Sequence, residues 1–177
     1  TEIPIGCFNS LSIDGAVFER LDNTWLPPNI TKIGRAAFHK VFIKQFNYTN
    51  STNTPVDIDA YAFRQNSRLT SLAGMKMNVK GTNAFRDCTA LTSLEGWDTT
   101  QTDIPRSTFR GCTGLQNISG IPESITKINN GAFAFTNITT LEGLNNITET
   151  TSSIKTLGDE GDLTNVDTLT GVFEGCQ

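Results

Sequence analysis

Short apolar steps alternate with polar residues along this chain, and they recur at fixed distances from a phenylalanine. Three stretches are copies of one unit: AFRQNSRLTSLAGM from Ala62, AFRDCTALTSLEGW from Ala84 and TFRGCTGLQNISGIP from Thr108. In each unit the Phe is followed by Leu, by a second aliphatic residue and then by Gly. A further apolar step precedes the Phe, as in ITKIGRAAF ending at Phe38. The pattern predicts two short strand-like edges in every unit, joined by turns, and little regular helix.

The phenylalanines set the length of the repeat. From Phe38 to Phe133 successive anchors are 25, 22, 24 and 24 residues apart, and Phe18 precedes Phe38 by 20. A unit this short cannot bury its own apolar face, so neighbouring units must stack. We therefore expect residues 1–177 to form one domain, a right-handed leucine-rich-repeat solenoid of about seven coils with short parallel strands. The expected spine of the stack is Phe38, Phe63, Phe85, Phe109, Phe133 and Phe173.

A glycine follows the second aliphatic residue, at Gly74, Gly96 and Gly120. If each glycine forms a β-bulge, the next residues in the column, Met75, Trp97, Ile121 and Leu144, turn into the core. Strict alternation would instead expose them as an apolar stripe of the kind that marks an interaction site. The position of Trp97 distinguishes these two alternatives.

Cysteine occurs in a repeated slot, three residues after the anchor Phe, at Cys88, Cys112 and Cys176. Other units place Val41, Asn66 or Thr136 there, so we interpret the slot as a packing position with buried thiols. A Cys88–Cys112 disulfide remains possible because the two residues lie one coil apart. The absence of a Cys-x-x-Cys pair argues against a zinc site.

Few residues offer catalytic chemistry. The single histidine, His39, is expected in a solvated turn. Asp57 and Asp59 alternate along one face of VDIDAY, which is how parallel β-helix polysaccharide enzymes hold carboxylates or calcium, but no second acidic pair follows in neighbouring units. The GDEGD stretch at residues 158–162 lacks the order of a calcium loop. We predict no enzyme activity, no metal and no cofactor.

Composition and charge narrow the possible partners. Charged residues make up only 18% of the chain, and Thr and Asn, which favour turns and short strands, take their place. The net charge is -4 and no run of Lys or Arg occurs, which argues against nucleic acid or anionic membranes as partners. No apolar run is long enough to span a bilayer.

The pattern Ala-Phe-x-x-Cys-x-x-Leu-x-x-Leu, with Ile-Pro-x-x-Ile-x-x-Ile before the next Phe, resembles the BspA-type leucine-rich repeat of bacterial and protist surface proteins. The segment TFRGCTGLQNISGIPESITKINNGAF is the closest copy, and TNVDTLTGVFEGC, ending at Cys176, is similar to the related repeat of bacterial surface lipoproteins. The resemblance implies a secreted or surface-anchored protein that engages in adhesion or host-protein binding. It carries no catalytic residues over to this chain.

We therefore expect a cell-surface or extracellular module that recognises a protein or glycan through solvent-facing strand columns. The candidate ligand-binding residues are Ser71, Ser93, Glu95, Asn117, Ser119, Thr140 and Glu142. A passive spacer that presents another domain is the alternative. The chain stops at Gln177, shortly after Phe173, where the repeat would continue. We therefore expect either that the chain is a fragment of a longer array or that a partner or a second copy covers the last coil, which would support self-association.

Overall fold

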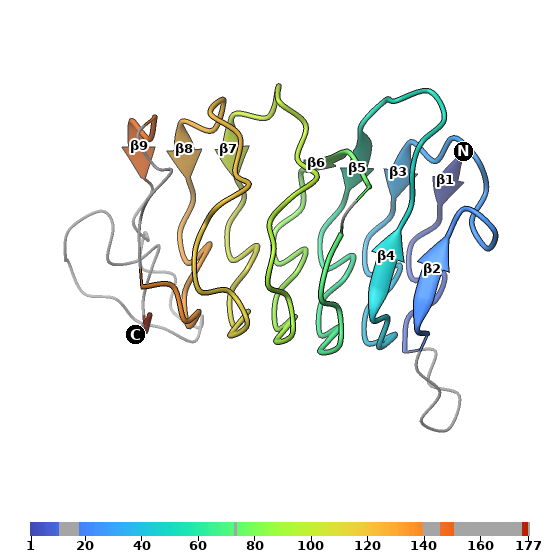
Figure 1. Cartoon of the computed structure of the whole chain (residues 1–177), viewed down its shortest axis with the longest axis horizontal. Coiled ribbons are helices and arrows are strands. Elements are labelled where there is room, and N and C mark those ends of the chain that lie inside the picture. Colours follow the sequence, from blue (N-terminus) through green and yellow to red (C-terminus); the bar gives the residue numbers. More distant parts are fainter. Residues whose placement is uncertain (11–17, 73, 140–145, 151–174, 177) are drawn as a thin grey trace.

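The computed structural model describes residues 1–10, 18–72, 74–139, 146–150 and 175–176. Over these ranges the chain winds as a parallel β-solenoid, with successive coils side by side along the long axis (Figure 1). Every strand is two or three residues long, and no helix occurs in the described ranges. The predicted fold class is confirmed.

One edge of each coil carries the strand that precedes the anchor Phe. These strands form two parallel sheets, with strand orders β1-β3-β5-β6 and β7-β8-β9. Their bounds are β1 Glu2–Ile3, β3 Lys32–Ile33, β5 Val56–Ile58, β6 Met77–Val79, β7 Asp103–Ile104, β8 Lys127–Ile128 and β9 Glu149–Thr150. The pairing keeps equivalent residues in register, for example Ile33 with Ile58 and Ile58 with Val79. Because side chains alternate along a strand, this register stacks the aliphatic residues inward and turns the polar residues between them to solvent.

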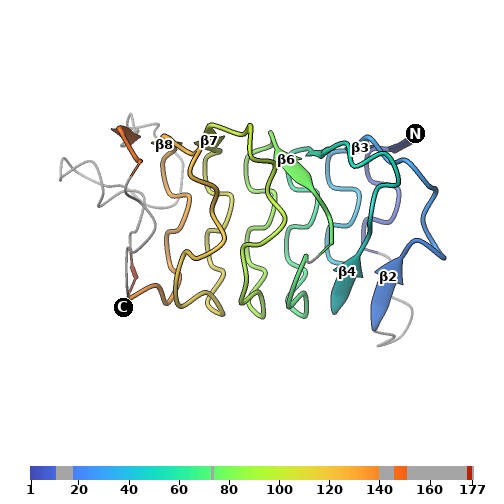
Figure 2. The same cartoon turned by 45° about the horizontal axis from the view of Figure 1, so that its top comes forward.

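The opposite edge, which we call the aliphatic edge, holds the Leu-x-x-Leu steps and is less regular. Among the described residues, only β2 (Arg20–Asp22) and β4 (Gln45–Asn47) pair there as strands, and Figure 2 shows them apart from the other strands. An isolated bridge joins Gln45 to Ser71 on this edge, whereas the bridge from Met77 to Trp97 extends the β5–β6 sheet on the other edge. The aliphatic side chains still point inward, since Leu72, Leu94 and Ile118 are all buried.

Between these edges the anchor phenylalanines stack ring on ring. Phe38, Phe63, Phe85, Phe109 and Phe133 are fully buried, and consecutive ring centroids lie 5.3 to 5.5 Å apart with interplanar angles of 15° or less. Five of the six predicted spine residues are therefore confirmed. Phe173 lies outside the described residues, so the expected total of seven coils stays a prediction.

The spine begins at Phe8 rather than at Phe18. The Phe8 ring stacks on Phe38 at 5.1 Å with an interplanar angle of 7°, and β1 pairs with β3 in the equivalent register. Placing Phe18 in the series from its spacing was therefore wrong. Phe18 instead packs, partly buried, against the side of the core.

The turns around each Phe are held by a backbone ladder between coils. The N–H groups of Phe38, Phe63 and Phe109 each donate, at 2.8 Å, to the carbonyl of the residue before the next anchor. The residues two positions before and two positions after each anchor adopt positive φ, as at Ala36 (54°) and Lys40 (58°) around Phe38. Left-handed residues on both sides of the Phe reverse the chain direction sharply, which points alternate N–H groups at the neighbouring coil.

The glycine bulges occur as predicted. Gly74, Gly96 and Gly120 have φ of 88°, 99° and 92°, and a Cβ on Gly96 would lie 2.4 Å from the carbonyl oxygen of Met75. The following side chains turn inward: Met75 and Trp97 are 1% and 6% exposed, and Ile121 packs partly buried against the core. Leu144 lies outside the described residues. The alternative of an exposed apolar stripe is excluded for Met75 and Trp97.

Candidate functional site

The ladder of strands is interrupted between β6 and β7, where a side chain takes the place of a backbone. The N–H of Val79 donates to Oε1 of Gln101, and Nε2 of Gln101 donates to the carbonyls of Val79 and Asp103, each at 2.7 Å. The Gln101 amide thus gives β6 the donor and acceptor that a neighbouring strand would supply. Gln101 is only 6% exposed, so these bonds are shielded from water.

A polar groove of about 520 Å³ opens beside this break. Amides and hydroxyls dominate its walls, with one carboxylate and two basic groups at the rim: Asn78, Thr82, Thr100, Gln101, Thr102, Asn129, Asp103, Lys80 and Arg106. Asn129 donates to Asp103 at 2.9 Å, and Lys80 forms an ion pair with Asp57 at 2.8 Å. These contacts hold the Asp103 and Lys80 side chains in place at the groove. It can offer hydrogen bonds to a ligand but contains no Ser, Cys or His nucleophile among its lining residues.

The predicted ligand-binding residues lie on the aliphatic edge, but they do not form continuous strand columns. Ser71 bridges to Gln45, whereas Ser93 and Asn117 lie outside any strand. Their polar atoms cap local turns: Ser93 Oγ accepts from the N–H of Glu95 at 3.3 Å, and Asn117 Oδ1 accepts from the N–H of Ser119 at 3.1 Å. The left-handed glycines that follow bend the chain away from strand geometry, so the expected columns were wrong in this respect. Thr140 and Glu142 lie outside the described residues.

The paired acids Asp57 and Asp59 are engaged in ion pairs rather than in an acidic site. Asp57 pairs with Lys80 at 2.8 Å, and Asp59 pairs with Lys32 at 3.5 Å. Each partner comes from a neighbouring coil, so the pairs link the outward faces of stacked strands. Within the described ranges no three His, Cys, Asp or Glu residues are grouped so that they could hold a metal ion. The GDEGD stretch lies outside those ranges.

His39 is more constrained than a solvated turn residue. It is half-buried, and its two ring nitrogens lie 3.1 Å from Asn9 Oδ1 and 3.1 Å from Gln65 Oε1. The imidazole therefore links three successive coils. The described structure gives it amide partners on both sides, which is a positioning arrangement rather than that of a catalytic base.

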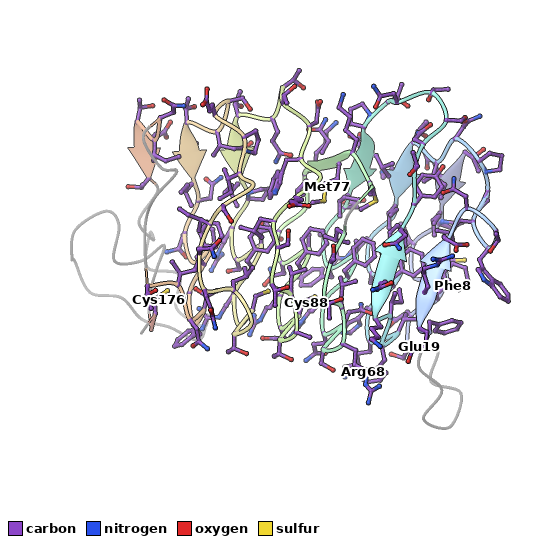
Figure 3. The ribbon with its side chains drawn as sticks, viewed as in Figure 1. Phe8, Glu19, Arg68, Met77, Cys88 and Cys176 are labelled. Atoms are coloured by element: carbon purple, nitrogen blue, oxygen red, sulfur yellow. The ribbon has the colours of Figure 1, made fainter. Side chains whose placement is uncertain are left out.

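The repeated cysteine slot is a hydrogen-bonding position as well as a packing position. The thiols of Cys88 and Cys112 donate at 3.1 Å to the carbonyls of Phe63 and Phe85, one coil earlier, and Cys176 donates to Phe133 at 3.3 Å. Figure 3 shows Cys88 and Cys176 level with each other and separated along the horizontal long axis of the solenoid. All three are free thiols. Burial, together with the neighbouring Cys88 thiol, raises the pKa of Cys112 well above its ordinary value.

The basic residues gather where sequence reasoning found no cluster. We define the Phe-turn wall as the described residues within three positions of each stacked anchor: 5–10, 35–41, 60–66, 82–88, 106–112 and 130–136. It contains six basic residues and a single acid, Asp87, although the whole chain has a net charge of -4. The basic residues are Arg35, Lys40, Arg64, Arg86, Arg106 and Arg110. They are separated by whole repeats, so no run of charge marks them in the sequence. Comparing the residue that directly follows each anchor would have revealed the column.

These features define a repeat solenoid with polar surfaces and, in the described residues, no recognisable catalytic centre. The model of the BspA-type leucine-rich repeat region matches residues 1–70 and 32–156, with six copies. The chain therefore belongs to the BspA-type leucine-rich-repeat family. The match does not extend to the last segment, so its likeness to the lipoprotein repeat stays a prediction.

Among solved structures, the chain is similar to a leucine-rich cell surface protein from Faecalibacterium prausnitzii A2-165. The two share 22% sequence identity and superpose with a TM-score of 0.64 over 84% of this chain. The match covers 38% of the other protein, so this chain spans well under half of that neighbour's length. No match was found among the curated proteins. No helix in the described ranges has the length and apolar character needed to cross a membrane.

Proposed function

We propose that this chain is a ligand-binding module of a cell-surface or extracellular protein, and that the groove at the β6–β7 break receives a glycan. The observation that carries the proposal is that the Gln101 side chain takes the place of a strand between β6 and β7. This replacement opens a concave polar surface in the ladder of strands. Family membership, together with a structural neighbour described as a cell surface protein, supports the location.

The groove matches the chemistry of a hydroxyl-rich ligand. Sugar hydroxyls both donate and accept hydrogen bonds, and the Asn78 amide and the Thr82, Thr100 and Thr102 hydroxyls can do the same. The stacked coils beneath hold these groups on a rigid support, which limits the ordering cost of binding. A single carboxylate, Asp103, lines the groove, whereas glycosidases normally use two. Binding without turnover is the function that this set of residues supports.

The aliphatic edge is the weaker candidate surface. Glu95, Asn117 and Ser119 are exposed, but Asn117 accepts hydrogen bonds from both the N–H and the hydroxyl of Ser119. A ligand there would have to compete with these local bonds. A spacer role predicts that neither surface binds anything.

The test is a glycan array followed by calorimetry on the best ligand. The groove variant N78A/T102A is compared with the matched variant E95A/S119A on the aliphatic edge. We expect the groove variant to lose about tenfold or more in affinity, because each lost hydrogen bond contributes about 1 kcal/mol, and the edge variant to stay within about twofold. Loss only in the edge variant would move the site to that edge. A silent array would support the spacer role.

A further inference from the structure

The Phe-turn wall stacks basic side chains on consecutive coils. Backbone hydrogen bonds join Lys40 to Arg64 at 3.0 Å, Gln65 to Arg86 at 2.7 Å and Asp87 to Arg110 at 2.8 Å, so the three arginines occupy equivalent positions in neighbouring coils. The phenylalanine rings behind them repeat every 5.3 to 5.5 Å. Like charges in register on adjacent strands repel one another. The repeat therefore maintains a column of positive charge at a cost to its own stability.

The charge is most concentrated around Tyr61. The guanidinium carbons of Arg35 and Arg64 lie 5.1 and 5.7 Å from the centre of the Tyr61 ring, so two cations share one aromatic side chain. Within the described residues neither arginine forms an ion pair with a carboxylate. The Nε atom of Arg64 is buried and has no hydrogen-bond partner there. Arg64 is half-buried and Arg35 is exposed, so a bound anion can reach both side chains and supply the negative charge that they lack.

We propose that the Phe-turn wall binds a linear acidic polysaccharide that carries one carboxylate on each sugar ring. Arg35 and Arg64 hold one carboxylate beside Tyr61, and Arg86 and Arg110 engage successive carboxylates along the stack. To do so, Arg86 exchanges its 3.5 Å ion pair with Asp87 for the ligand, while Arg110 stays over the Phe135 ring. None of these four arginines lines the groove, although the wall and the groove meet at Thr82 and Arg106. The wall also differs from the groove in chemistry, because recognition here rests on charge rather than on sugar hydroxyls.

The spacing of the coils favours a polysaccharide over an acidic peptide. In an extended peptide the side chains on one face recur about every 6.8 Å, so carboxylates would fall out of step with coils that repeat every 5.3 to 5.5 Å. A polysaccharide with a carboxylate on every ring presents its charges one per monomer, so that consecutive charges can meet consecutive coils. Arginine also forms two parallel hydrogen bonds to a carboxylate, which fixes its orientation.

The experiment measures binding of polygalacturonate to the full chain by biolayer interferometry at low and high salt. Its fully methyl-esterified form has the same backbone without charge and serves as the ligand control. The variant R64Q/R86Q tests the wall, and R68Q is the matched control, because Arg68 is exposed and lies outside the wall at the lower edge of Figure 3. Thermal unfolding of each variant verifies that it is folded.

We expect wild type and R68Q to bind polygalacturonate equally, with affinity that falls as salt rises, and R64Q/R86Q to lose about tenfold or more while remaining at least as stable as wild type. The groove variant N78A/T102A, which changes no residue of the wall, should bind normally, which separates this inference from the proposed function. Equal binding of the methyl ester would overturn the proposal. So would tighter binding of poly-glutamate, binding of dextran sulfate alone, equal loss in R68Q, or no binding at all.

Discussion

The Phe-turn wall and the aliphatic edge come from the same repeat, yet they are ordered to very different degrees. On the wall, each coil from Phe8 to Phe109 donates backbone hydrogen bonds to the next coil at matching positions, and the rings behind them stack without a break. On the aliphatic edge, the described residues show one pair of strands followed by a single bridge. The apolar side chains are buried on both. Burial of apolar residues therefore does not by itself impose strand geometry, and the continuity of the solenoid rests on the wall.

This difference also separates the surfaces available for binding. The wall repeats its backbone without change, so residues that follow each anchor form columns, and charge can accumulate along them. The edge that carries the strands preceding each anchor Phe tolerates an interruption between β6 and β7, because the Phe-turn wall stays continuous over the same coils. Gln101 occupies that interruption, and the polar groove lies there. Repeat proteins commonly vary one face while a conserved geometry elsewhere supports the stack.

The strongest test of the comparison is Phe109→Ala. This ring lies between Phe85 and Phe133, with centroids 5.5 and 5.4 Å away, and it also contacts Trp97. We expect a loss of about 3 to 5 kcal/mol in the free energy of unfolding, measured in urea. Ile118→Ala, on the aliphatic edge, should cost less, about 2 to 3 kcal/mol. Equal losses in these two variants would contradict the conclusion that the continuity of the solenoid rests on the wall. Trp25→Ala is the control: Trp25 is exposed, and its removal should change the free energy of unfolding by less than about 0.5 kcal/mol.

Gln101→Ala tests whether one amide does replace a strand. Without it, the buried N–H and carbonyl of Val79 lose their partner, and each unsatisfied group costs about 1 to 3 kcal/mol. We expect a total loss of about 2 to 4 kcal/mol by urea unfolding. Gln116→Ala is the matched control, since Gln116 is exposed and should tolerate truncation within about 0.5 kcal/mol. If both variants were equally stable, water would be satisfying Val79 and the break would be an ordinary loop.

The contrast also explains how much of the molecule the sequence could predict. The stack was predictable because Phe and its neighbouring small residue return at nearly constant spacing. Phe18 misled because 20 residues is close to that spacing, whereas the true first anchor, Phe8, lies 30 residues before Phe38. The first coil carries a longer excursion, and only the pairing of β1 with β3 reveals which Phe stacks.

The proposed binding surfaces were harder to predict from the sequence. Gln101 has no local signal, because its role depends on the distance between two strands that are far apart in the chain. Arg64, Arg86 and Arg110 do have a signal, since each directly follows an anchor. This signal appears only when the repeats are aligned and the residues at one equivalent position are compared. The predicted ligand residues failed as strand columns because Gly96 and Gly120 turn the backbone at positive φ.

The buried Cys112 thiol makes the stability of the wall fall at alkaline pH. Burial raises the pKa of Cys112 in the folded state above its unfolded value of about 8.5. The unfolded chain therefore releases this proton first, so stability is full below that value and falls as pH rises beyond it. We expect wild type to lose about 1 kcal/mol between pH 8 and about pH 9.5, measured by urea unfolding. Cys112→Ala should show a smaller loss, and Cys7→Ala, at an exposed thiol, should behave as wild type. Identical pH profiles for all three proteins would contradict a raised pKa at Cys112.

The finest test of the wall uses two adjacent alanines that should respond in opposite directions. Ala36 has φ of 54°, and the equivalent positions of two other coils hold Gly6 and Gly131, both at 63°. A residue with a Cβ is strained in this conformation, and glycine removes the strain at some entropic cost, so Ala36→Gly should gain about 0.5 kcal/mol. Ala37 is fully buried and is not among the residues with positive φ. Ala37→Gly loses a packed methyl group as well as backbone restriction, and it should cost about 1 to 2 kcal/mol. The urea midpoint of Ala36→Gly should therefore lie above that of wild type, and the midpoint of Ala37→Gly should lie below it. A loss at Ala36 similar to that at Ala37 would mean that the left-handed turns flanking each anchor are not a strained and regular feature of the wall.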